Sequence, residues 1–356
     1  MEIKVVKTQK DKKAFIEFKR RLYENDQSYS ITAEFVLNNV LNRTTTFIKS
    51  IFTMPILILD DEGNVCAECI FMHEPTLALL QVGFFEALDN KEAVDFLIQE
   101  AKTVARNRNL VRIIFGLNSH LSYGVGILTK GFEYKNSFDN IYNKDYYSKF
   151  FEGYETETLS TYKSNLENVR TLVERVCNLI DHSNSESITI RCADLKHHFT
   201  EEMEKLRQII NKTVGNTFLF TKTGPNHYKE ILGSLKFYLN NENLIFAEDN
   251  GKPIGFVFWH PDFCQTLENG KYYNLLNIAL KFNDKEKIDN IVLNSFGSQT
   301  PLATMKLLQA LEAKIEPKYK TIETTFVWDN NTNSTLLNKR FFGSAYRKYN
   351  VYFLNV

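Results

Sequence analysis

Two stretches of the chain share one pattern of apolar and polar residues. Each has an apolar run, a short polar turn with glycine and a second apolar run: ILILDDEGNVCAECIFM at residues 56–72 and LIFAEDNGKPIGFVFW at residues 244–259. Apolar runs of this length, bounded by Asp, Asn and Gly, are typical of β-hairpins. The sequence therefore predicts the same hairpin in each half of the chain.

The elements after each hairpin also repeat. A further apolar strand follows, LLQVGFFEAL in one half and NIVLN in the other, and then an amphipathic helix at residues 91–106 and 301–313. In both helices apolar residues recur every three or four positions, which gives one face that can be buried. A return strand (VRIIFGLN, TIETTFVW) and a short helix complete each copy. Residues 266–287 of the second copy have no counterpart in the first.

Between the copies, residues 162–179 have helical spacing and the polar stretch DHSNSES breaks it. The alternating stretch SITIRCADL then predicts a strand, and residues 200–213 predict another helix. We place a domain boundary near residue 155, which gives an N-terminal domain of residues 1–155 and a C-terminal domain of residues 156–356. The fold class is α/β, with a mixed α+β sheet flanked by helices in each domain.

Composition narrows the class of protein. Lys plus Arg and Asp plus Glu number 43 each, so no net field attracts nucleic acid or an anionic membrane. The N-terminus lacks the apolar core of a signal peptide, and no run approaches the roughly 20 apolar residues of a membrane span. We expect a cytoplasmic protein with no nucleic-acid or membrane partner. Cys66 and Cys69 form a CxxC, but no second pair lies at zinc-ligand spacing, so we expect structural cysteines and no metal.

The order of elements resembles the GCN5-related N-acetyltransferase (GNAT) superfamily, present here twice. It is similar to an uncharacterised bacterial group of tandem proteins through VGFFEALDN, FGLNSHLSYGVGILTKGFEYKNSFDNIYNKDYY, GKPIGFVFWHPDFCQTLENGK and VWDNNTNSTLLNKRFFGSAYRKYNVY. The resemblance covers most of the chain. It implies two acyl-CoA N-acyltransferase domains, although a fold does not by itself dictate an activity.

The resemblance also implies where acetyl-CoA would lie. In the family the cosubstrate lies between two splayed strands, and its pyrophosphate lies on a glycine-containing loop at a helix N-terminus, where N–H groups are uncommitted. The matching positions here are in the second half: Leu293, Asn294, Ser295, Gly297, Ser298, Gln299, Thr300 and, at the last helix, Asn331. One family glycine and the family arginine are absent. In the first half the matching stretch runs from Glu86 to Glu92, whose carboxylates would repel a pyrophosphate.

Three residues are candidates for catalysis. His260 and Asp262 follow a strand in FWHPD, and Glu323 occupies one defined face of TIETTFVW. Each has a structural alternative: HPD as a turn in which Asp262 caps backbone N–H groups, and Glu323 as an exposed charge. The family's usual acid, a Tyr before a Gly-Phe pair, is replaced by Ile127 in the first half and Asn338 in the second. Tyr123 and Tyr346 lie nearby, where packing is the alternative role.

Three functions remain open from the sequence. The first is an acyl-CoA-dependent N-acetyltransferase that acts on a small amine from the second domain. The second is a non-catalytic tandem protein that binds a small molecule or partner between its domains. The third is an aminoacyl transferase, which also uses two such domains but needs a basic surface for tRNA. The oligomeric state is left open.

Overall fold

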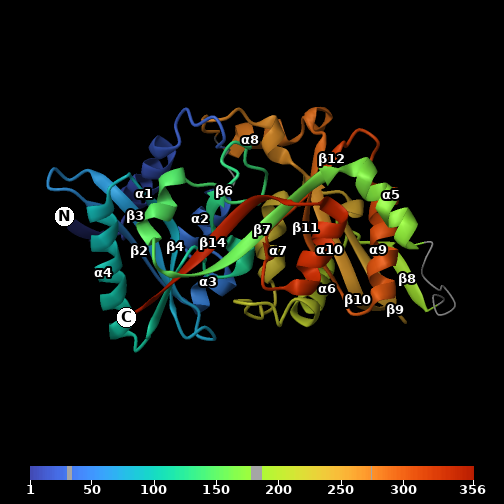
Figure 1. Cartoon of the computed structure of the whole chain (residues 1–356), viewed down its shortest axis with the longest axis horizontal. Helices are drawn as coiled ribbons and strands as arrows, with labels where there is room; N and C mark the ends of the chain where they lie inside the picture. Colours follow the sequence, from blue (N-terminus) through green and yellow to red (C-terminus); the bar gives the residue numbers. More distant parts are fainter. Residues whose placement is uncertain (30–33, 178–186, 274) are drawn as a thin grey trace.

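The computed structural model describes residues 1–29, 34–177, 187–273 and 275–356. A single mixed β-sheet runs through both halves of the molecule, with helices on its faces (Figure 1). The strand order is β1-β2-β3-β4-β5-β14-β7-β12-β11-β10-β9-β8, while β6 pairs with β14 and β13 pairs with β7. The mixed sheet flanked by helices confirms the predicted fold class.

The first half of the chain supplies one end of the sheet. Its elements are β1 (Glu2–Val5), α1 (Gln9–Leu22), α2 (Glu34–Leu41), α3 (Thr46–Ser50), β2 (Phe52–Leu59), β3 (Val65–His73), β4 (Leu80–Ala87), α4 (Lys91–Asn107), β5 (Arg112–Phe115), a short 3-10 helix (Leu121–Tyr123), β6 (Ile127–Lys130) and a second 3-10 helix (Asp145–Phe151). The predicted hairpin is β2 and β3, and the predicted amphipathic helix is α4. Asn90 caps α4 by accepting the N–H of Ala93.

The second half repeats the arrangement at the other end of the sheet. Its elements are β7 (Glu155–Asn165), α5 (Leu166–Cys177), β8 (Ile188–Cys192), α6 (Phe199–Thr213), α7 (His227–Leu232), β9 (Leu244–Asp249), β10 (Lys252–Pro261), α8 (Leu275–Phe282), β11 (Asn290–Ser298), α9 (Pro301–Lys314), β12 (Thr321–Thr324), β13 (Val327–Trp328), α10 (Thr332–Phe342) and β14 (Ala345–Asn355), with short 3-10 helices at Gly233–Leu235, Asn241–Asn243, Phe263–Thr266 and Lys285–Lys287. The predicted hairpin is β9 and β10.

Helices α6 and α9 cover opposite faces of this end of the sheet. A Cβ atom at Gly255 would lie 2.9 Å from Leu307 of α9, and one at Gly297 would lie 2.5 Å from the hydroxyl of Thr213 of α6. Gly255 and Gly297 lie on the neighbouring strands β10 and β11, one register position apart. Consecutive positions of a strand face opposite sides, so both glycines allow a helix to approach the sheet closely.

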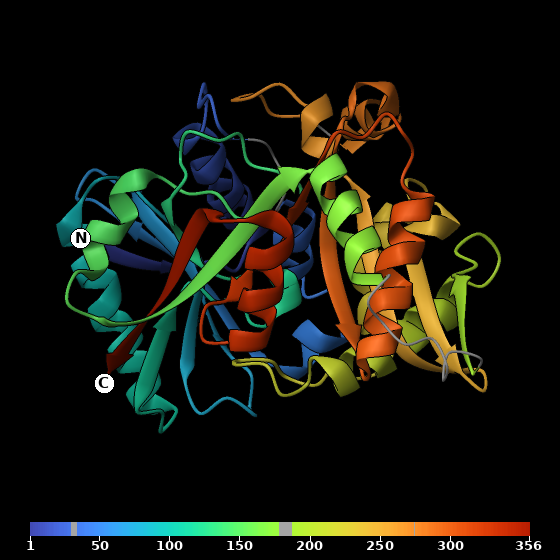
Figure 2. The ribbon, with the colours of Figure 1, turned by 45° about the vertical axis from the view of Figure 1, so that its right-hand side comes forward.

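Strands β7 and β14 join the two halves of the sheet. Strand β7 pairs with β12 of the second half through residues 163–165, whereas the C-terminal strand β14 pairs with β5 of the first half. β7 and β14 also pair with each other along almost their whole length, and they cross the middle of the molecule together (Figure 2). Neither half is therefore a closed unit of sheet, and the boundary near residue 155 stays a prediction.

The extra segment of the second half contacts the first half. It carries α8, and the N–H of Gly270 donates to the carbonyl of Tyr29 while the carbonyl of Gly270 accepts the N–H of Asn25. A Cβ at Gly270 would lie 2.6 Å from the Cα of Asn25, so only glycine permits this approach. The insertion thus joins the two halves at a second place.

Two local predictions were wrong. Residues 162–165 belong to strand β7, and the helix begins at Leu166; the predicted end at Leu179 and residues 181–186 lie outside the described part of the chain. The predicted last helix of the first half is instead the 3-10 helix Leu121–Tyr123 followed by strand β6. Pairing with the C-terminal strand β14 makes β6 a strand, and this long-range contact has no local signal.

Among the described residues, no helix combines the length and apolar character needed to cross a bilayer.

Candidate functional site

Strands β11 and β12 separate in the middle of the second half. They pair in parallel only from Asn290–Thr321 to Leu293–Thr324. Beyond this point β11 continues along β10, with a register shift that leaves Asn294 as an extra residue, and the chain after β12 turns toward β7. A bulge of this kind bends a strand and frees part of its hydrogen-bonding edge. The separation opens at Asn294, where the sequence predicts the site.

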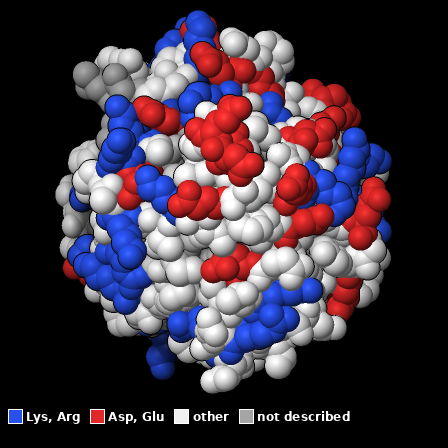
Figure 3. All heavy atoms as spheres, turned by 90° about the vertical axis from the view of Figure 1, so that its left-hand side faces the viewer, with Lys and Arg blue, Asp and Glu red and all other residues white. Residues whose placement is uncertain are grey.

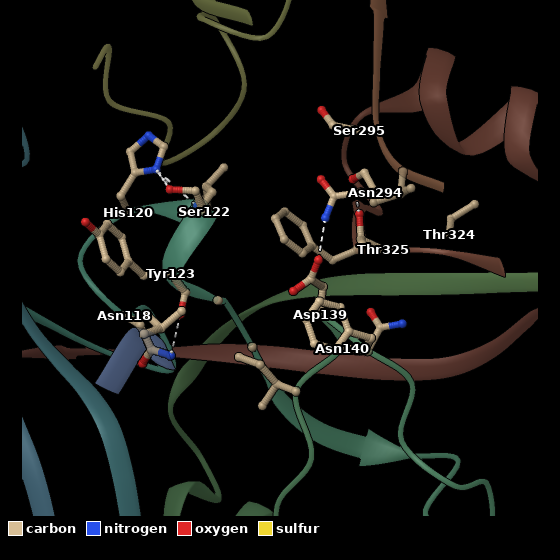
Figure 4. Close-up of a pocket in the computed structure, with 18 of the residues that line it drawn as sticks. Asn118, His120, Ser122, Tyr123, Asp139, Asn140, Asn294, Ser295, Thr324 and Thr325 are labelled. Atoms are coloured by element: carbon tan, nitrogen blue, oxygen red, sulfur yellow. Dashed lines mark hydrogen bonds between the residues drawn. The ribbon is translucent and has the colours of Figure 1, made fainter. Parts of the chain in front are cut away.

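A cavity of about 430 Å³ extends from this gap toward the first half. Its second-half wall includes the separated strands together with parts of α6, α7 and α10, and its first-half wall includes β4 and the loops that follow β5 and β6. Figure 4 shows side chains of both halves around it. The volume lies within the range of small-molecule sites, about 300–1,000 Å³. The cavity therefore belongs to both halves.

Asp139 is the carboxylate that the first half places at the second-half gap. Its Oδ2 accepts a 2.7 Å hydrogen bond from Asn294 Nδ2 and lies 3.0 Å from His260 Nε2 (Figure 4 shows the Asn294 bond). The backbone of Asp139 has φ +68°, a left-handed conformation that Asp tolerates better than most residues. Its side chain is 34% exposed and lines the cavity, so Asp139 combines a fixed position with access to a ligand.

His260 lies behind Asp139 and is fully buried. Its Nδ1 faces the carbonyl oxygen of Pro261 at 2.9 Å and its Nε2 faces the Asp139 carboxylate, and both partners can only accept hydrogen bonds. These partners assign a proton to each ring nitrogen. Burial by itself would lower the pKa of His260, but the hydrogen bond and charge of Asp139 outweigh it and raise the pKa. We therefore describe the pair as an imidazolium held against a carboxylate.

Asp262 and Glu323 lie together in a buried polar cluster, and neither lines the cavity. Asp262 accepts the N–H groups of Phe138 and Cys264, and Asn290 Nδ2 bridges Asp262 and Glu323 at 3.3 and 3.2 Å. Burial raises the pKa of both carboxyl groups, and their mutual repulsion adds to it at Glu323. Asp262 caps the turn after β10, which is the structural alternative given for the HPD motif.

The same cluster holds residues 136–140 of the first half in place. Glu323 accepts hydrogen bonds from Ser137 Oγ and from Asn140 Nδ2, the latter at 2.9 Å, and pairs with Lys163 at 3.4 Å. Asp139 lies within this segment. The structure thus brings His260, Asp262 and Glu323 together, as supports of the loop that presents Asp139.

The predicted cosubstrate residues divide into two groups. Leu293, Asn294, Ser295 and Asn331 line the cavity. Asn331 is also the N-cap of α10, since its Oδ1 accepts the N–H of Ser334 at 3.2 Å. For Asn331 the capping role and the cavity position therefore coexist.

Residues 297–300, by contrast, use their polar groups internally and are absent from the cavity wall. Gly297 lies within β11 and faces Thr213, so its lack of a side chain serves helix packing, not phosphate approach. The N–H of Gln299 donates to the carbonyl of Ile254, and the Thr300 hydroxyl caps α9 by accepting the N–H of Ala303. Ser298 Oγ contacts the Thr300 carbonyl at 3.1 Å. The loop leaves few N–H groups for a pyrophosphate, because the next residue, Pro301, has none.

In the first half the equivalent gap is filled. Strands β4 and β5 pair in parallel as far as Val82–Phe115, and two residues later the N–H of Phe84 donates to Asn118 Oδ1 at 2.7 Å. Gln81 Nε2 donates to the carbonyl of Ser119 at 2.9 Å. A Cβ at Gly83 would lie 2.8 Å from the Leu117 carbonyl, so strand and loop touch here.

Two histidines and a serine form a further polar group on the cavity wall. His120 Nδ1 lies 2.7 Å from Ser122 Oγ, whose other neighbour is His227 Nε2 at 2.9 Å. His120 and Ser122 line the cavity, and Figure 4 draws them on the side opposite Asp139. Burial lowers the pKa of His120 to about 4, and burial with the nearby His120 lowers the pKa of His227 well below its ordinary range. Both rings are therefore neutral near pH 7.

No family model matches the chain. Protein YghO of Escherichia coli (strain K12) is 21% identical over 364 residues, which span 96% of this chain and 92% of that protein.

Solved structures are similar over the whole chain. A tandem GNAT protein from the clavulanic acid biosynthesis pathway superposes with a TM-score of 0.55 at 9% identity, over 99% of this chain and 98% of its own. The chain has the tandem GNAT fold. A GCN5-related glucosamine N-acetyltransferase region of a fungal multi-domain β-N-acetylglucosaminidase gives 0.53 at 10% identity, over 99% and 38%. A probable N-acyltransferase of unknown function from Enterococcus faecalis gives 0.52 at 8% identity, over 100% and 72%.

The residues at or near the family's acid position lie in different parts of the structure. Ile127 lies in strand β6, and Asn338 lies on α10 and lines the cavity. Tyr346 is absent from the cavity wall, and burial raises its pKa strongly. Tyr123 does line the cavity, but its hydroxyl contacts that of Thr45 at 3.0 Å and burial raises its pKa to about 12.

Within the described residues no group of three or more His, Cys, Asp or Glu side chains is arranged to hold a metal, and Cys66 and Cys69 are buried in β3.

Proposed function

We propose that the protein is an acyl-CoA-dependent N-acyltransferase that acts on a small amine. The acyl donor enters the gap between β11 and β12, and the amine lies in the cavity beside Asp139. The observation that carries the proposal is that this gap opens into a cavity whose facing wall supplies a fixed, accessible carboxylate. In this proposal the groups that bind the acyl donor come from the second half of the chain, and the carboxylate that takes the proton comes from the first half.

The chemistry needs an oriented amine and a polarised thioester. Asp139 attracts the ammonium form of the acceptor and takes its proton, directly or through water. The N–H groups of β11 that lose β12 as a partner face the thioester carbonyl and stabilise the oxyanion that develops. The amine nitrogen then bonds to the carbonyl carbon as the carbon–sulfur bond breaks. Of the two protons that the ammonium loses, one ends on the leaving thiolate and one passes through Asp139 to solvent.

His260 acts in this proposal as the partner of Asp139, not as the base. Its imidazolium and the amide of Asn294 both donate to the Asp139 carboxylate and fix its orientation. Glu323 and Asp262 position the loop that carries Asp139 and do not touch the acceptor. The catalytic role that the sequence predicted for the buried cluster therefore belongs in this proposal to Asp139, the residue that the cluster supports.

The phosphate end of the cosubstrate contributes little in this proposal. The N–H groups of Gln299 and Ala303 are already bonded within the protein, so most of the affinity for acetyl-CoA comes from its pantetheine arm and acyl group. We expect acetyl-CoA to bind weakly and a pantetheine thioester to bind nearly as well. Two of the similar structures, a glucosamine N-acetyltransferase region and a probable N-acyltransferase, support this reaction class.

Isothermal titration of the full chain with acetyl-CoA and with CoA tests the proposal. We expect saturable binding of both, followed by amide formation when an amine acceptor is added. An absence of binding at millimolar ligand would contradict it.

A non-catalytic binding protein is the second candidate, since the filled gap of the first half and the occupied loop at Thr300 favour it. Binding of amines without acyl-CoA binding or turnover would select it.

An aminoacyl transferase receives less support. The first-half face in Figure 3 carries basic and acidic side chains together, and not the continuous basic surface that tRNA requires.

A further inference from the structure

The hydrogen bonds around His120 determine which groups the far end of the cavity can bind. His120 Nε2 lies 2.9 Å from the carbonyl oxygen of Thr221, which only accepts, so this nitrogen carries the proton. His120 Nδ1 accepts the backbone N–H of Ser122 at 3.1 Å, which agrees with a neutral ring whose lone pair is at Nδ1. The tautomer of His120 is thus assigned by two independent partners.

The proton of the Ser122 hydroxyl has one favoured direction. Since His120 Nδ1 is an acceptor 2.7 Å from Ser122 Oγ, the hydroxyl donates to His120. His227 Nε2, on the other side at 2.9 Å, then donates to Ser122 Oγ. His227 Nδ1 is buried and has no hydrogen-bond partner among the described residues, and a buried lone pair is better tolerated there than a buried N–H donor. Ser122 therefore presents a remaining lone pair and no proton.

Several of the first-half donors in the cavity wall are engaged with acceptors of the protein. Asn118 Nδ2 donates to the carbonyl of Tyr123 at 3.2 Å. The ammonium of Lys19 is 2.6 Å from Glu86, whose second oxygen accepts the Tyr147 hydroxyl at 2.8 Å. Asp139, at the other end, also accepts only. Both polar ends of the cavity therefore favour ligand groups that donate hydrogen bonds.

We infer that the acceptor substrate is an amine that carries a second hydrogen-bond donor, either a hydroxyl or a second ammonium group. One amine lies at Asp139 and is acylated, and the second donor binds Ser122. Apolar side chains of the cavity wall, such as Phe138 and Phe220, suit a hydrocarbon spacer. Amines that end in a carboxylate, including amino acids, are disfavoured because their oxygens would face the lone pairs of Ser122 and Asp139. The inference rests on the proposed function for the reaction but not for the binding.

The test uses straight-chain amines that end in methyl, hydroxyl, ammonium or carboxylate. The four compounds are matched in length, and the set is repeated at several chain lengths. Calorimetry without acyl-CoA measures their binding to the full chain, and kcat/KM with acetyl-CoA measures their use. We expect the hydroxyl and ammonium compounds to bind about tenfold more tightly than the methyl compound, as one hydrogen bond provides. The carboxylate compounds should bind weakest.

Ser122→Ala should remove this preference while binding of the methyl compound is retained. Ser234→Ala is the matched control, since Ser234 lines the same cavity but is exposed and has no part in the proposed site. Circular dichroism confirms that both variants fold, and the wild-type comparison among ligands does not depend on them.

Equal binding of the methyl, hydroxyl and ammonium compounds, or preference for the carboxylate, would overturn the inference even if acyl transfer occurs. Selective binding of the donor compounds without acyl-CoA binding would instead contradict the proposed function and leave the Ser122 subsite in place. The two failures are therefore distinguishable.

Discussion

The parallel strands β4 and β5 separate after Val82 and Phe115, and β11 and β12 separate after Leu293 and Thr324. Both halves thus form the same gap at the same place in the fold. Two residues beyond the last pair, the first half has the buried Phe84 and the second has Ser295.

The contents of the two gaps differ. In the first half the side chain of Asn118 fills the gap by accepting the N–H of Phe84 at the edge of β4. In the second half Thr325 Oγ1 donates to the Asn294 carbonyl at 2.6 Å, while the side chain of Asn294 turns to Asp139, a residue of the other half, and lines the cavity. In a duplicated fold, one copy can therefore retain the binding site for an acyl donor, while the other copy contributes a wall of the cavity and side chains such as Asp139. The comparison makes specific predictions.

The largest effect is expected from Asp139→Asn. The amide keeps the shape and the contact near Asn294 but cannot take a proton and no longer balances the charge of His260. We expect kcat/KM for the amine to fall by about 10²–10⁴, the range for loss of a general base. Acetyl-CoA binding by calorimetry should change less than twofold. A variant with wild-type kcat/KM would show that the first half supplies no chemistry.

Ser295→Phe should make the second gap resemble the first. The ring would occupy the space between β11 and β12 that the acyl chain needs, and we expect acetyl-CoA affinity to fall at least about tenfold through steric exclusion. The matched control is Phe84→Leu in the first half, which should leave acetyl-CoA binding unchanged. If Phe84→Leu weakens the binding and Ser295→Phe does not, the donor lies in the first half.

Gly83→Ala tests the closed gap through stability. Its methyl group would lie 2.4 Å from Met72 Cε and 2.9 Å from the Cα of Asn118, so strand and loop would have to move apart. Overpacking of this kind costs about 1–3 kcal/mol in the free energy of unfolding, measured by urea denaturation. Acetyl-CoA affinity should not change, because this gap holds protein. A loss of affinity that equals that of Ser295→Phe would contradict the assignment.

Local elements of both halves were predictable, and the site between them was only partly so. The hairpins, α4, α6 and α9 follow from periodicity, turn residues and caps, which act over a few positions. The separation of β11 and β12 near Asn294 was expected from the family resemblance. The face of Glu323 could not be chosen, because alternation defines two faces but not which one meets the cavity.

Asp139 was missed for a related reason. It lies 155 positions from its partner Asn294 and 121 from His260, and no motif marks it within NSFDN. Its position depends on long-range contacts that hold a first-half loop against the second-half sheet. A usable signal would have been the unusual number of polar residues in 136–140 that the fold must bury, since buried polar groups need partners.

The smallest effect expected concerns His120 and His260, which should respond to pH in opposite directions. The folded protein keeps His120 neutral with a pKa of about 4, so it binds fewer protons than the unfolded chain below pH 6.5, and its contribution to stability is lost as the pH falls toward 4. The raised pKa of His260 has the reverse consequence: its contribution is complete below pH 6.5 and is lost as the pH rises through the folded pKa.

Urea denaturation across pH 4 to 9 measures both contributions as differences from the wild type. His120→Asn should reduce the slope of unfolding free energy below pH 6.5, and His260→Gln should reduce the opposite slope above it, each by at most about 1.4 kcal/mol per pH unit. Carboxyl groups remote from both rings titrate equally in wild type and variants and cancel in the difference, whereas Asp262, whose pKa the charge of His260 lowers, contributes to the difference for His260→Gln. If both variants changed the slope in the same pH range, the assignment of one neutral and one charged histidine would be wrong, and with it the acceptor-only character of Ser122 or the fixed charge beside Asp139.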